Sequence, residues 1–379
     1  MIRPLHDVPA RPADLLPALA AALDGTGPAV RPGASGPSSA VADDVAVVVR
    51  TSGSTGEPRA VLLSATALRA SAAATHARLA GPGRWVLALP TEHVAGLQVL
   101  VRSVLAGTTP VTLDPGPFRA PAFVAAASAL PADGPRYTSL VPTQLVRLLE
   151  DPAATRALTT FDAVLLGGAA ASPDLLARAR ATGVPVVTTY GMSETCGGCV
   201  YDGRPLDGVR VALDDDGRIL LAGPVLADGY LGRPDLDADA FVQVDGVRHL
   251  RTTDLGEWSS GVLTVLGRAD DVLVTGGAKV PPGPVESVLA GLPGVGEVCV
   301  VGVPDAEWGE AVVAVVVPRP GEPPPTLDDA RRAVTDRLGA AHAPRHLVVT
   351  DSLPVRGPGK IDRRATARLA ARSLERTST

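Results

Sequence analysis

The residues most able to do chemistry lie in a short loop rich in glycine and hydroxyl groups. Residues 51–59 read T-S-G-S-T-G-E-P-R and directly follow the apolar run 45–49. Glycines let the backbone aim successive N–H groups at one anion, while hydroxyls and a terminal cation supply further donors. The Walker spacing G-x-x-x-x-G-K-[ST] is absent from the sequence, which excludes the P-loop kinases and NTPases. The loop predicts a phosphate-binding site, with a simple Ser/Gly-rich turn as the alternative.

Five further segments follow this loop in an order that has a known counterpart. They are L-P-T-E-H-V-A-G (89–96), Y-G-M-S-E-T (190–195), R-T-T-D-L-G (251–256), G-R-A-D-D (267–271) and P-V-R-G-P-G-K (354–360). With the loop, they resemble the motifs of the acyl-adenylate-forming family, which includes acyl-CoA synthetases, luciferases and the adenylation domains of peptide synthetases. Six motifs in the family's order, spread over about 310 residues, argue against a chance match.

The resemblance implies a two-step reaction on a carboxylic acid. A carboxylate is a poor electrophile at neutral pH, so the enzyme attaches AMP to it, pyrophosphate leaves, and the thiol of coenzyme A then displaces AMP. Because the carboxylate and the α-phosphate are both anions, their approach requires preorganised donors and a cation. We therefore expect an acid–thiol ligase that uses a small carboxylic acid, ATP, Mg²⁺ and coenzyme A.

The resemblance also assigns residues to the phosphates of ATP. The 51–59 loop would hold the β- and γ-phosphates, and Arg59 would replace the usual lysine while keeping its charge. Ser193, where the family usually has threonine, would contact the α-phosphate through its retained hydroxyl. Glu194 would bind Mg²⁺, a hard cation that prefers oxygen ligands beside phosphates.

The nucleoside would be held by a second group of residues. Asp254 would accept hydrogen bonds from both ribose hydroxyls with the help of Arg268, and Tyr190 would stack on the adenine. The complete set of expected nucleotide-binding residues is Thr51, Ser52, Gly53, Ser54, Thr55, Gly56, Gly168, Tyr190, Gly191, Ser193, Asp254 and Arg268.

Lys360 would bridge the carboxylate and the α-phosphate during adenylation. It lies far from the loop in sequence and in a smaller C-terminal unit, so one closed arrangement cannot serve both half-reactions. The family is understood to rotate its small domain about a hinge residue, here Asp270. That rotation would present Lys360 for adenylation and residues 276–279 for thioester formation.

The acid pocket is expected beside His93, because L-P-x-x-H-x-x-G resembles the family's segment at that place; an ordinary core or surface histidine is the alternative. Within the family, the chain most resembles the 2-succinylbenzoate–CoA ligases of menaquinone biosynthesis, whose substrate carries a second carboxylate. Arg102 is the candidate anchor for that carboxylate, and a solvent-facing helix arginine is the alternative. Pocket walls are expected from residues 97–101, 139–143 and 167–171, with Leu97, Thr143 and Gly167 as candidates.

Alternating strands and helices should position these residues. Residues 45–49 form a continuous apolar run that is mostly β-branched, typical of a strand covered by helices on both faces. Similar runs separated by Ala-rich helical stretches predict an α/β architecture, at residues 85–89, 163–166, 185–188 and 209–213. We predict a large, helix-covered, multi-sheet AMP-binding domain over residues 1–267.

A smaller, mobile α+β lid domain is predicted over residues 268–379. Its expected strands lie at 296–303 and 311–317, and a helix at 327–338 follows the proline-rich connector 318–325. At the other end, the phosphate loop begins at Thr51, whereas it usually lies much further into the chain in the family. We therefore expect the large domain to be trimmed at its N-terminus.

Composition excludes several classes of protein. The chain has 379 residues, 46% of them hydrophobic, and a net charge of -5, which gives no general electrostatic footprint for nucleic acid. Its three cysteines favour a reducing cytoplasm over a disulfide framework, and the apolar stretch 15–23 is too short for a membrane span or signal peptide. The C-x-x-C of residues 196–199 has no second pair, which argues against structural zinc. A homodimer is compatible with the sequence.

Other readings remain open at this point. The nearest keeps the fold and changes the acid, or loads a carrier-protein thiol. A second is a nucleotide-binding protein that has lost catalysis, which the presence of Glu194, Asp254, Arg268 and Lys360 argues against, since a binding module needs no Lys360.

Overall fold

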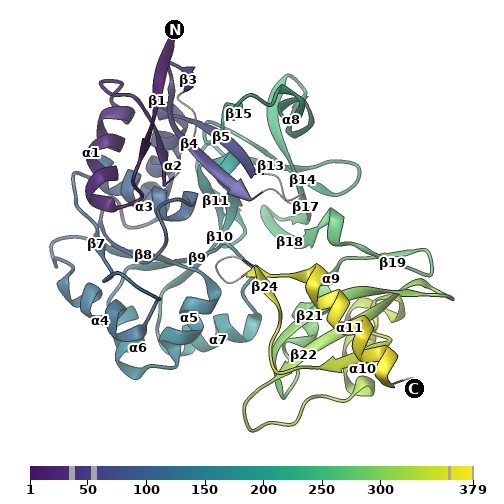
Figure 1. Cartoon of the computed structure of the whole chain (residues 1–379). Coiled ribbons are helices and arrows are strands. Elements are labelled where there is room, and N and C mark those ends of the chain that lie inside the picture. The colour runs from purple at the N-terminus through teal and green to yellow at the C-terminus, as the bar shows by residue number, and fades with distance from the viewer. Residues whose placement is uncertain (34–38, 53–57, 357–359, 378–379) are drawn as a thin grey trace.

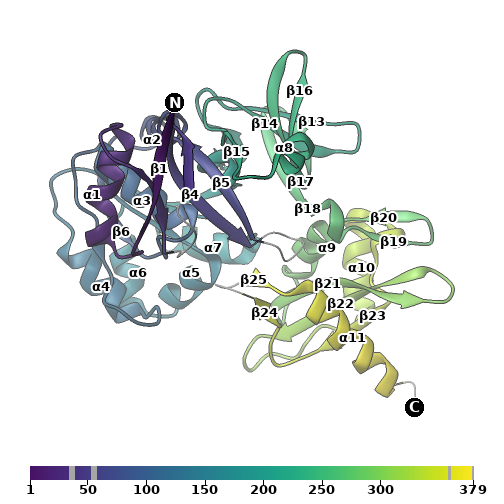
Figure 2. The same cartoon turned by 45° about the horizontal axis from the view of Figure 1, so that its top comes forward.

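The computed structural model describes residues 1–33, 39–52, 58–356 and 360–377. The described strands up to residue 268 form three sheets, which we call the large body, and those after residue 270 form the small body (Figures 1 and 2). Strands and helices alternate along much of the chain, as the sequence predicts, and the α/β class is confirmed.

The first sheet of the large body carries the strand that leads into the phosphate loop. Strand β4 (Val45–Ser52) is central, and its first five side chains are at most 1% exposed. It pairs in antiparallel fashion with β5 (Pro58–Ser64) and in parallel with β2 (Ala29–Pro32). The other strands of this sheet are β1 (Ile2–Val8), β3 (Ser39–Ala42) and β15 (Gly229–Tyr230).

The second sheet lies between two layers of helices (Figure 1). Its order is β12 (Arg204–Pro205), β11 (Gly197–Tyr201), β10 (Val186–Met192), β9 (Ala163–Leu166), β8 (Arg136–Leu140), β6 (Arg84–Leu87) and β7 (Val111–Thr112). Trp85 and Leu87 pack into one core and Val86 into another, which explains the unbroken apolar run on this strand.

One helical layer separates the first two sheets and the other covers the far face. The inner helices are α1 (Pro12–Leu23), α2 (Ala65–Arg78) and α3 (Val94–Leu105). The outer helices are α4 (Ala120–Ala129), α5 (Pro142–Leu149), α6 (Pro152–Leu158) and α7 (Pro173–Ala181). None of the helices in the described ranges is both long and apolar enough to cross a bilayer.

The third sheet brings the chain to the expected hinge at Asp270. It contains β13 (Arg210–Leu213), β14 (Arg218–Ala222), β16 (Phe241–Val244), β17 (Val247–Ser259) and β18 (Val262–Arg268), and helix α8 (Pro234–Ala240) precedes β16. Because β18 ends at Arg268, the 3-10 turn η2 (Ala269–Asp271) is the first element after the large body.

The small body is built around one long hairpin. Strands β21 (Val295–Asp305) and β22 (Gly309–Pro318) pair in antiparallel fashion, flanked by β19 (Leu273–Thr275), β20 (Ala278–Val280) and β23 (His346–Val349). Helices α9 (Pro282–Leu289) and α10 (Leu327–Leu338) pack on one face, and α11 (Arg363–Thr377) packs on the other. The turn η3 (Ala340–His342) follows α10, and the short hairpin of β24 (Val355–Arg356) and β25 (Lys360–Ile361) precedes α11.

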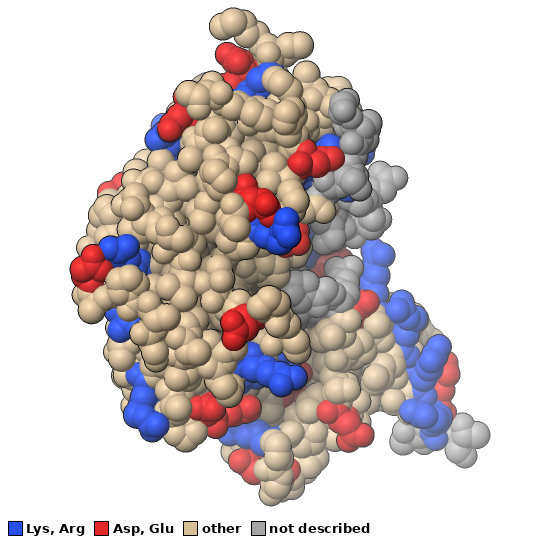
Figure 3. Space-filling view, turned by 60° about the vertical axis from the view of Figure 1, so that its left-hand side comes forward, with Lys and Arg blue, Asp and Glu red and all other residues tan. Residues whose placement is uncertain are grey.

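One face of the large body shows how its charged side chains are distributed. On the face that Figure 3 shows, basic and acidic side chains are interspersed there and do not gather into one field of a single sign. This distribution agrees with the composition, which gives no general attraction for a polyanion.

Candidate active site

Tyr190 and Asp254 form the first polar pair of the site. Strand β10 carries Tyr190 and strand β17 carries Asp254, and the tyrosine hydroxyl donates to Asp254 Oδ2 over 2.8 Å. Burial, followed by the charge of Asp254, raises the pKa of Tyr190, so the hydroxyl stays protonated and can donate. The hydroxyl therefore holds the Asp254 carboxylate in one orientation. The expected stacking of Tyr190 on adenine remains a prediction.

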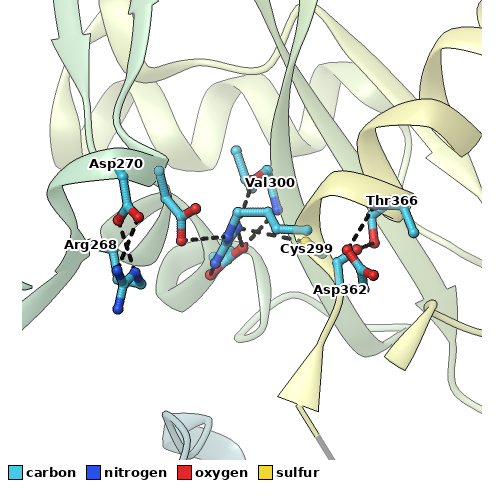
Figure 4. Close-up of polar contacts among 10 residues, drawn as sticks. Arg268, Asp270, Cys299, Val300, Asp362 and Thr366 are labelled. Atoms are coloured by element: carbon cyan, nitrogen blue, oxygen red, sulfur yellow. Dashed lines mark hydrogen bonds and ion pairs between the residues drawn. The ribbon is translucent and has the colours of Figure 1, made fainter. Parts of the chain in front are cut away.

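Arg268 lies opposite Asp254 in the ladder between β17 and β18. Its guanidinium is turned toward Asp270, the expected hinge residue, with Nε 2.8 Å from Oδ1 and Nη2 2.9 Å from Oδ2 of Asp270 (Figure 4). Burial raises the pKa of Asp254, although the Tyr190 hydroxyl and the Arg268 charge act in the opposite direction. The carboxylate expected to bind ribose is thus partly desolvated before any ligand arrives.

Glu194 is the centre of the second polar group. It lies in the 3-10 turn η1 (Ser193–Thr195) that follows β10, and its Oε1 accepts a hydrogen bond from the Tyr230 hydroxyl over 2.8 Å. The guanidinium carbon of Arg59 lies 5.7 Å from the centre of the Tyr230 ring. Glu194, the expected Mg²⁺ ligand, and Arg59, an expected phosphate contact, therefore meet at one tyrosine.

Tyr230 was missed by the sequence reasoning. The one signal for it in the sequence is that tyrosine is rare: the chain has four tyrosines. Two of the four hydrogen-bond to the carboxylates of the site. Burial and then the charge of Glu194 raise the pKa of Tyr230, which keeps it a donor.

The turn between β10 and β11 is tightly built. The Met192 N–H donates to Thr195 Oγ1 over 2.9 Å, and the Thr195 hydroxyl donates to the Gly197 carbonyl over 2.7 Å. A Cβ atom at Gly191 would lie 2.1 Å from the Gly197 carbonyl oxygen, so the close approach of the two strands requires glycine. This packing holds Ser193, which is 8% exposed, and Glu194 at the strand end.

The phosphate loop is described only at its two edges. Thr51 on β4 is the ladder partner of Arg59 on β5, and Ser52 is the partner of Pro58. Four of the expected phosphate-binding residues, Gly53, Ser54, Thr55 and Gly56, lie outside the described residues. The strands that enter and leave the loop are thus adjacent.

His93 is the N-cap residue of α3 and is exposed. Gly96 explains why the helix can begin there, because a Cβ atom at this position would lie 2.2 Å from the Pro90 carbonyl oxygen. The chain therefore turns closely over residues 90–96 and leaves His93 at the surface of the helix start.

The expected acid-pocket residues differ in their surroundings. Leu97 is fully buried in the core of the large body, whereas Thr143 on α5 is exposed. Gly167 follows β9, and a Cβ atom there would lie 2.3 Å from Thr189 Oγ1; the next residue, Gly168, has a φ of +80°. Arg102 is 3% exposed, so the alternative of a solvent-facing arginine is wrong.

The backbone of Lys360 lies in β25, opposite Arg356 in β24. Both strands lie on the side of the small body that faces the large body (Figures 1 and 2). The side chain of Lys360 lies outside the described residues, and its role remains a prediction.

The two thiols of the C-x-x-C segment are buried and unpaired with each other. Burial raises the pKa of both, that of Cys199 to about 12, so neither thiol is a reactive thiolate near neutral pH. Where the structure describes the chain, no group of three or more His, Cys, Asp or Glu side chains could hold a metal ion. Mg²⁺ commonly uses one or two carboxylates and completes its shell with substrate phosphates and water, so Glu194 alone fits such a role.

Replacement of Asp254 by Asn should stabilise the unliganded protein at neutral pH. Because the folded-state pKa of Asp254 is raised, the folded protein binds this proton more tightly than the unfolded chain, and stability is lost as the pH rises above the ordinary value of 3.8. Urea unfolding at pH 7 should show a gain on the order of 1 kcal/mol for Asp254→Asn. That gain should vanish toward pH 4.

The same variant should bind ATP at least about tenfold more weakly, because an amide cannot accept from both ribose hydroxyls as a carboxylate does. Asp215→Asn, at an exposed aspartate, is the matched control and should change neither property. A loss of stability at pH 7, or unchanged affinity for ATP, would contradict the role given to Asp254.

Comparison with known proteins identifies the family of this chain. Residues 8–231 match the model of the AMP-binding enzymes, and residues 284–360 match the model of the AMP-binding enzyme C-terminal domain. A probable 2-succinylbenzoate–CoA ligase of Mycobacterium tuberculosis is 49% identical, over 97% of this chain and 98% of the relative. A 2-succinylbenzoate–CoA ligase of Listeria monocytogenes is 32% identical, over 84% of this chain and 68% of the relative.

Solved structures show the same relationship. The o-succinylbenzoate CoA synthetase of Bacillus subtilis, in complex with its acyl-adenylate intermediate, matches with a TM-score of 0.71 and 29% identity, over 84% of this chain and 68% of that one. An amide bond synthetase of Marinactinospora thermotolerans matches with a TM-score of 0.77 and 29% identity, over 91% of this chain and 76% of that one. The chain belongs to the AMP-binding enzyme family.

Proposed function

We propose that this protein is an ATP-dependent acid–thiol ligase that converts 2-succinylbenzoate, through its acyl-adenylate, to 2-succinylbenzoyl-CoA for menaquinone biosynthesis. The observation that carries the proposal is the pairing of two tyrosine hydroxyls with two carboxylates, Tyr190 with Asp254 and Tyr230 with Glu194. The four residues come from β10, η1, β15 and β17, and their pairing supports a role for Asp254 at the ribose and for Glu194 at Mg²⁺. The ligases among the relatives support the choice of reaction.

In the first half-reaction, the chain's own groups orient two anions. Asp254 holds the ribose, Ser193 and Arg59 contact phosphate, and Mg²⁺ on Glu194 supplies charge neutralisation when bound. Lys360 bridges the incoming carboxylate and the α-phosphate. In the second half-reaction, the thiol of coenzyme A attacks the acyl carbon and AMP leaves.

We place the domain division at residues 267–268, with Asp270 as the hinge. The support is local: the third sheet ends at Arg268, and a new sheet begins at Leu273. Rotation there would let one site serve both half-reactions, with Lys360 withdrawn for the second. A cytoplasmic location fits the supply of ATP and coenzyme A.

Arg102 supports 2-succinylbenzoate in particular. The residue is 3% exposed, its guanidinium carbon lies 5.2 Å from the centre of the Trp85 ring, and its Nη2 lies 3.5 Å from the Tyr201 hydroxyl. Nε has no hydrogen-bond partner, and no carboxylate pairs with the guanidinium in the part of the chain that the structure describes. A buried charge without a counter-ion is costly, and a second substrate carboxylate would supply one.

The position of Arg102 on α3 agrees with an anchor at the end of an acid pocket. Val94, Gln98 and Arg102 are spaced by four residues and therefore lie on one face of the helix. A Cβ atom at Gly197 would be 3.4 Å from Gln98 Cγ and 3.9 Å from Val94 Cγ2, so this face meets β11 just beyond the η1 turn. This face of α3 thus packs along β11 from Gly197 to Tyr201, where Arg102 lies.

The direct test is formation of the CoA thioester from 2-succinylbenzoate, ATP and Mg²⁺, with benzoate, medium-chain fatty acids and a carrier-protein thiol as competitors. We expect turnover with 2-succinylbenzoate to exceed that with each other acid by at least about a hundredfold in kcat/KM, as befits a site that pairs a buried charge. Preference for another acid would contradict the choice of 2-succinylbenzoate as the substrate. Absence of adenylation with every acid would contradict the assignment as an acid–thiol ligase.

Arg102→Met should raise the KM for 2-succinylbenzoate and leave that for ATP unchanged. Loss of one partner of a buried charge pair costs about 2–5 kcal/mol, so the rise should be about thirtyfold or more. The exposed Arg147→Met on α5 is the matched control. An unchanged KM for the acid, in a variant whose thermal unfolding shows a folded protein, would rule out the anchor.

A further inference from the structure

Arg363 is the first residue of α11 and lies three positions after Lys360. Its Nη1 hydrogen-bonds to Glu286 Oε1 and, over 2.7 Å, to the Val300 carbonyl; its Nη2 lies 3.2 Å from Glu286 Oε2. Its Nε lies 3.3 Å from Oδ2 of Asp271. One guanidinium therefore joins the turn η2, helix α9 and strand β21 to the segment that follows Lys360.

These contacts are partly withdrawn from solvent. The side chains of Arg363, Glu286 and Asp271 are 28%, 20% and 32% exposed. Burial opposes the charge, but the hydrogen bond and the charge of Glu286 outweigh it and raise the pKa of Arg363. A forked guanidinium that meets Glu286, Asp271 and the Val300 carbonyl fixes direction as well as distance, which the single ammonium of lysine would not do.

The hinge turn makes one ion pair on each side. Asp270 pairs with Arg268, the last residue of β18, while its neighbour Asp271 pairs with Arg363 of the small body. The first pair lies at the residue about which the small body is proposed to rotate. The second pair lies wholly beyond Asp270 and can persist.

The segment that carries Lys360 is also fixed to α11. The Asp362 N–H donates to the Pro354 carbonyl over 2.8 Å, and Asp362 Oδ1 accepts from the Ala365 N–H over 2.9 Å. The start of α11 and the hairpin of β24 and β25 therefore move together. Whatever holds Arg363 also holds the backbone of Lys360.

We propose that Arg363 is a positioning residue that ties the Lys360 hairpin to the hinge through Asp271, so that rotation at the hinge delivers Lys360 to the adenylation site in a fixed orientation. The inference rests on the proposed function, because it concerns the adenylation step. It assigns Arg363 no contact with substrate. Loss of the tie should impair the half-reaction that uses Lys360 and spare the one that does not.

The test separates the two half-reactions in Asp271→Asn and in Arg363→Lys. Adenylation is followed by acid-dependent exchange of pyrophosphate into ATP, and thioester formation by adding coenzyme A to preformed acyl-adenylate. We expect adenylation to fall roughly ten- to a hundredfold, the effect of a small misplacement of a catalytic group, while thioester formation stays within about twofold. Arg368→Gln, at an exposed arginine of α11, is the control and should change neither rate.

Amine labelling gives a second readout that does not depend on activity. The sequence contains two lysines, Lys279 and Lys360. The labelling rate of Lys360 relative to Lys279 should change in Asp271→Asn and in Glu286→Gln, but not in Arg368→Gln.

An equal fall in the rates of both half-reactions would overturn the positioning role. So would variants in which neither rate changes and the labelling ratio also stays the same. Failure of the wild-type protein to exchange pyrophosphate with any acid would instead overturn the proposed function. The labelling ratio would still decide whether Asp271 and Glu286 hold the Lys360 hairpin.

Discussion

Two tyrosine hydroxyls hold the two carboxylates that we propose for the nucleotide site. Without a donor, a partly buried carboxylate either takes up a proton or turns toward water, and it can then no longer present both oxygens to a ligand. Tyr190 prevents this for Asp254, and Tyr230 does so for Glu194. The three sheets of the large body meet at this point, since Tyr190 belongs to the second, Tyr230 to the first and Asp254 to the third.

Much of this arrangement could be predicted from the sequence. The apolar run at 45–49 is a strand buried on both faces, and the helix expected at 327–338 is α10. Such predictions succeed because burial and periodicity are local properties of the chain. The site residues were predicted from motifs, so a residue outside every motif could not be identified. Tyr230 lies in the two-residue strand β15, and its importance arises from pairing with β5, a contact across more than about 160 positions that no local pattern records.

Arg102 and Arg363 show the same limit in a different way. The sequence identified Arg102 as a candidate but could not distinguish a buried guanidinium from a solvated one, because both occur on amphipathic helices. Arg363 stands among the closely spaced arginines of α11 and gives no local sign that it, unlike its neighbours, faces Glu286 and Asp271. In both cases the decisive fact is which partner the fold brings near.

The central claim is that this site joins an acid to AMP with the help of Lys360. The most direct measurement is acid-dependent exchange of labelled pyrophosphate into ATP, for the wild-type protein and for Lys360→Ala, with 2-succinylbenzoate as the acid. The account predicts exchange in the wild type and a loss of about a hundredfold or more in the variant, since the two anions would meet without their bridging cation. A Lys360→Ala protein that exchanges at the wild-type rate would contradict it.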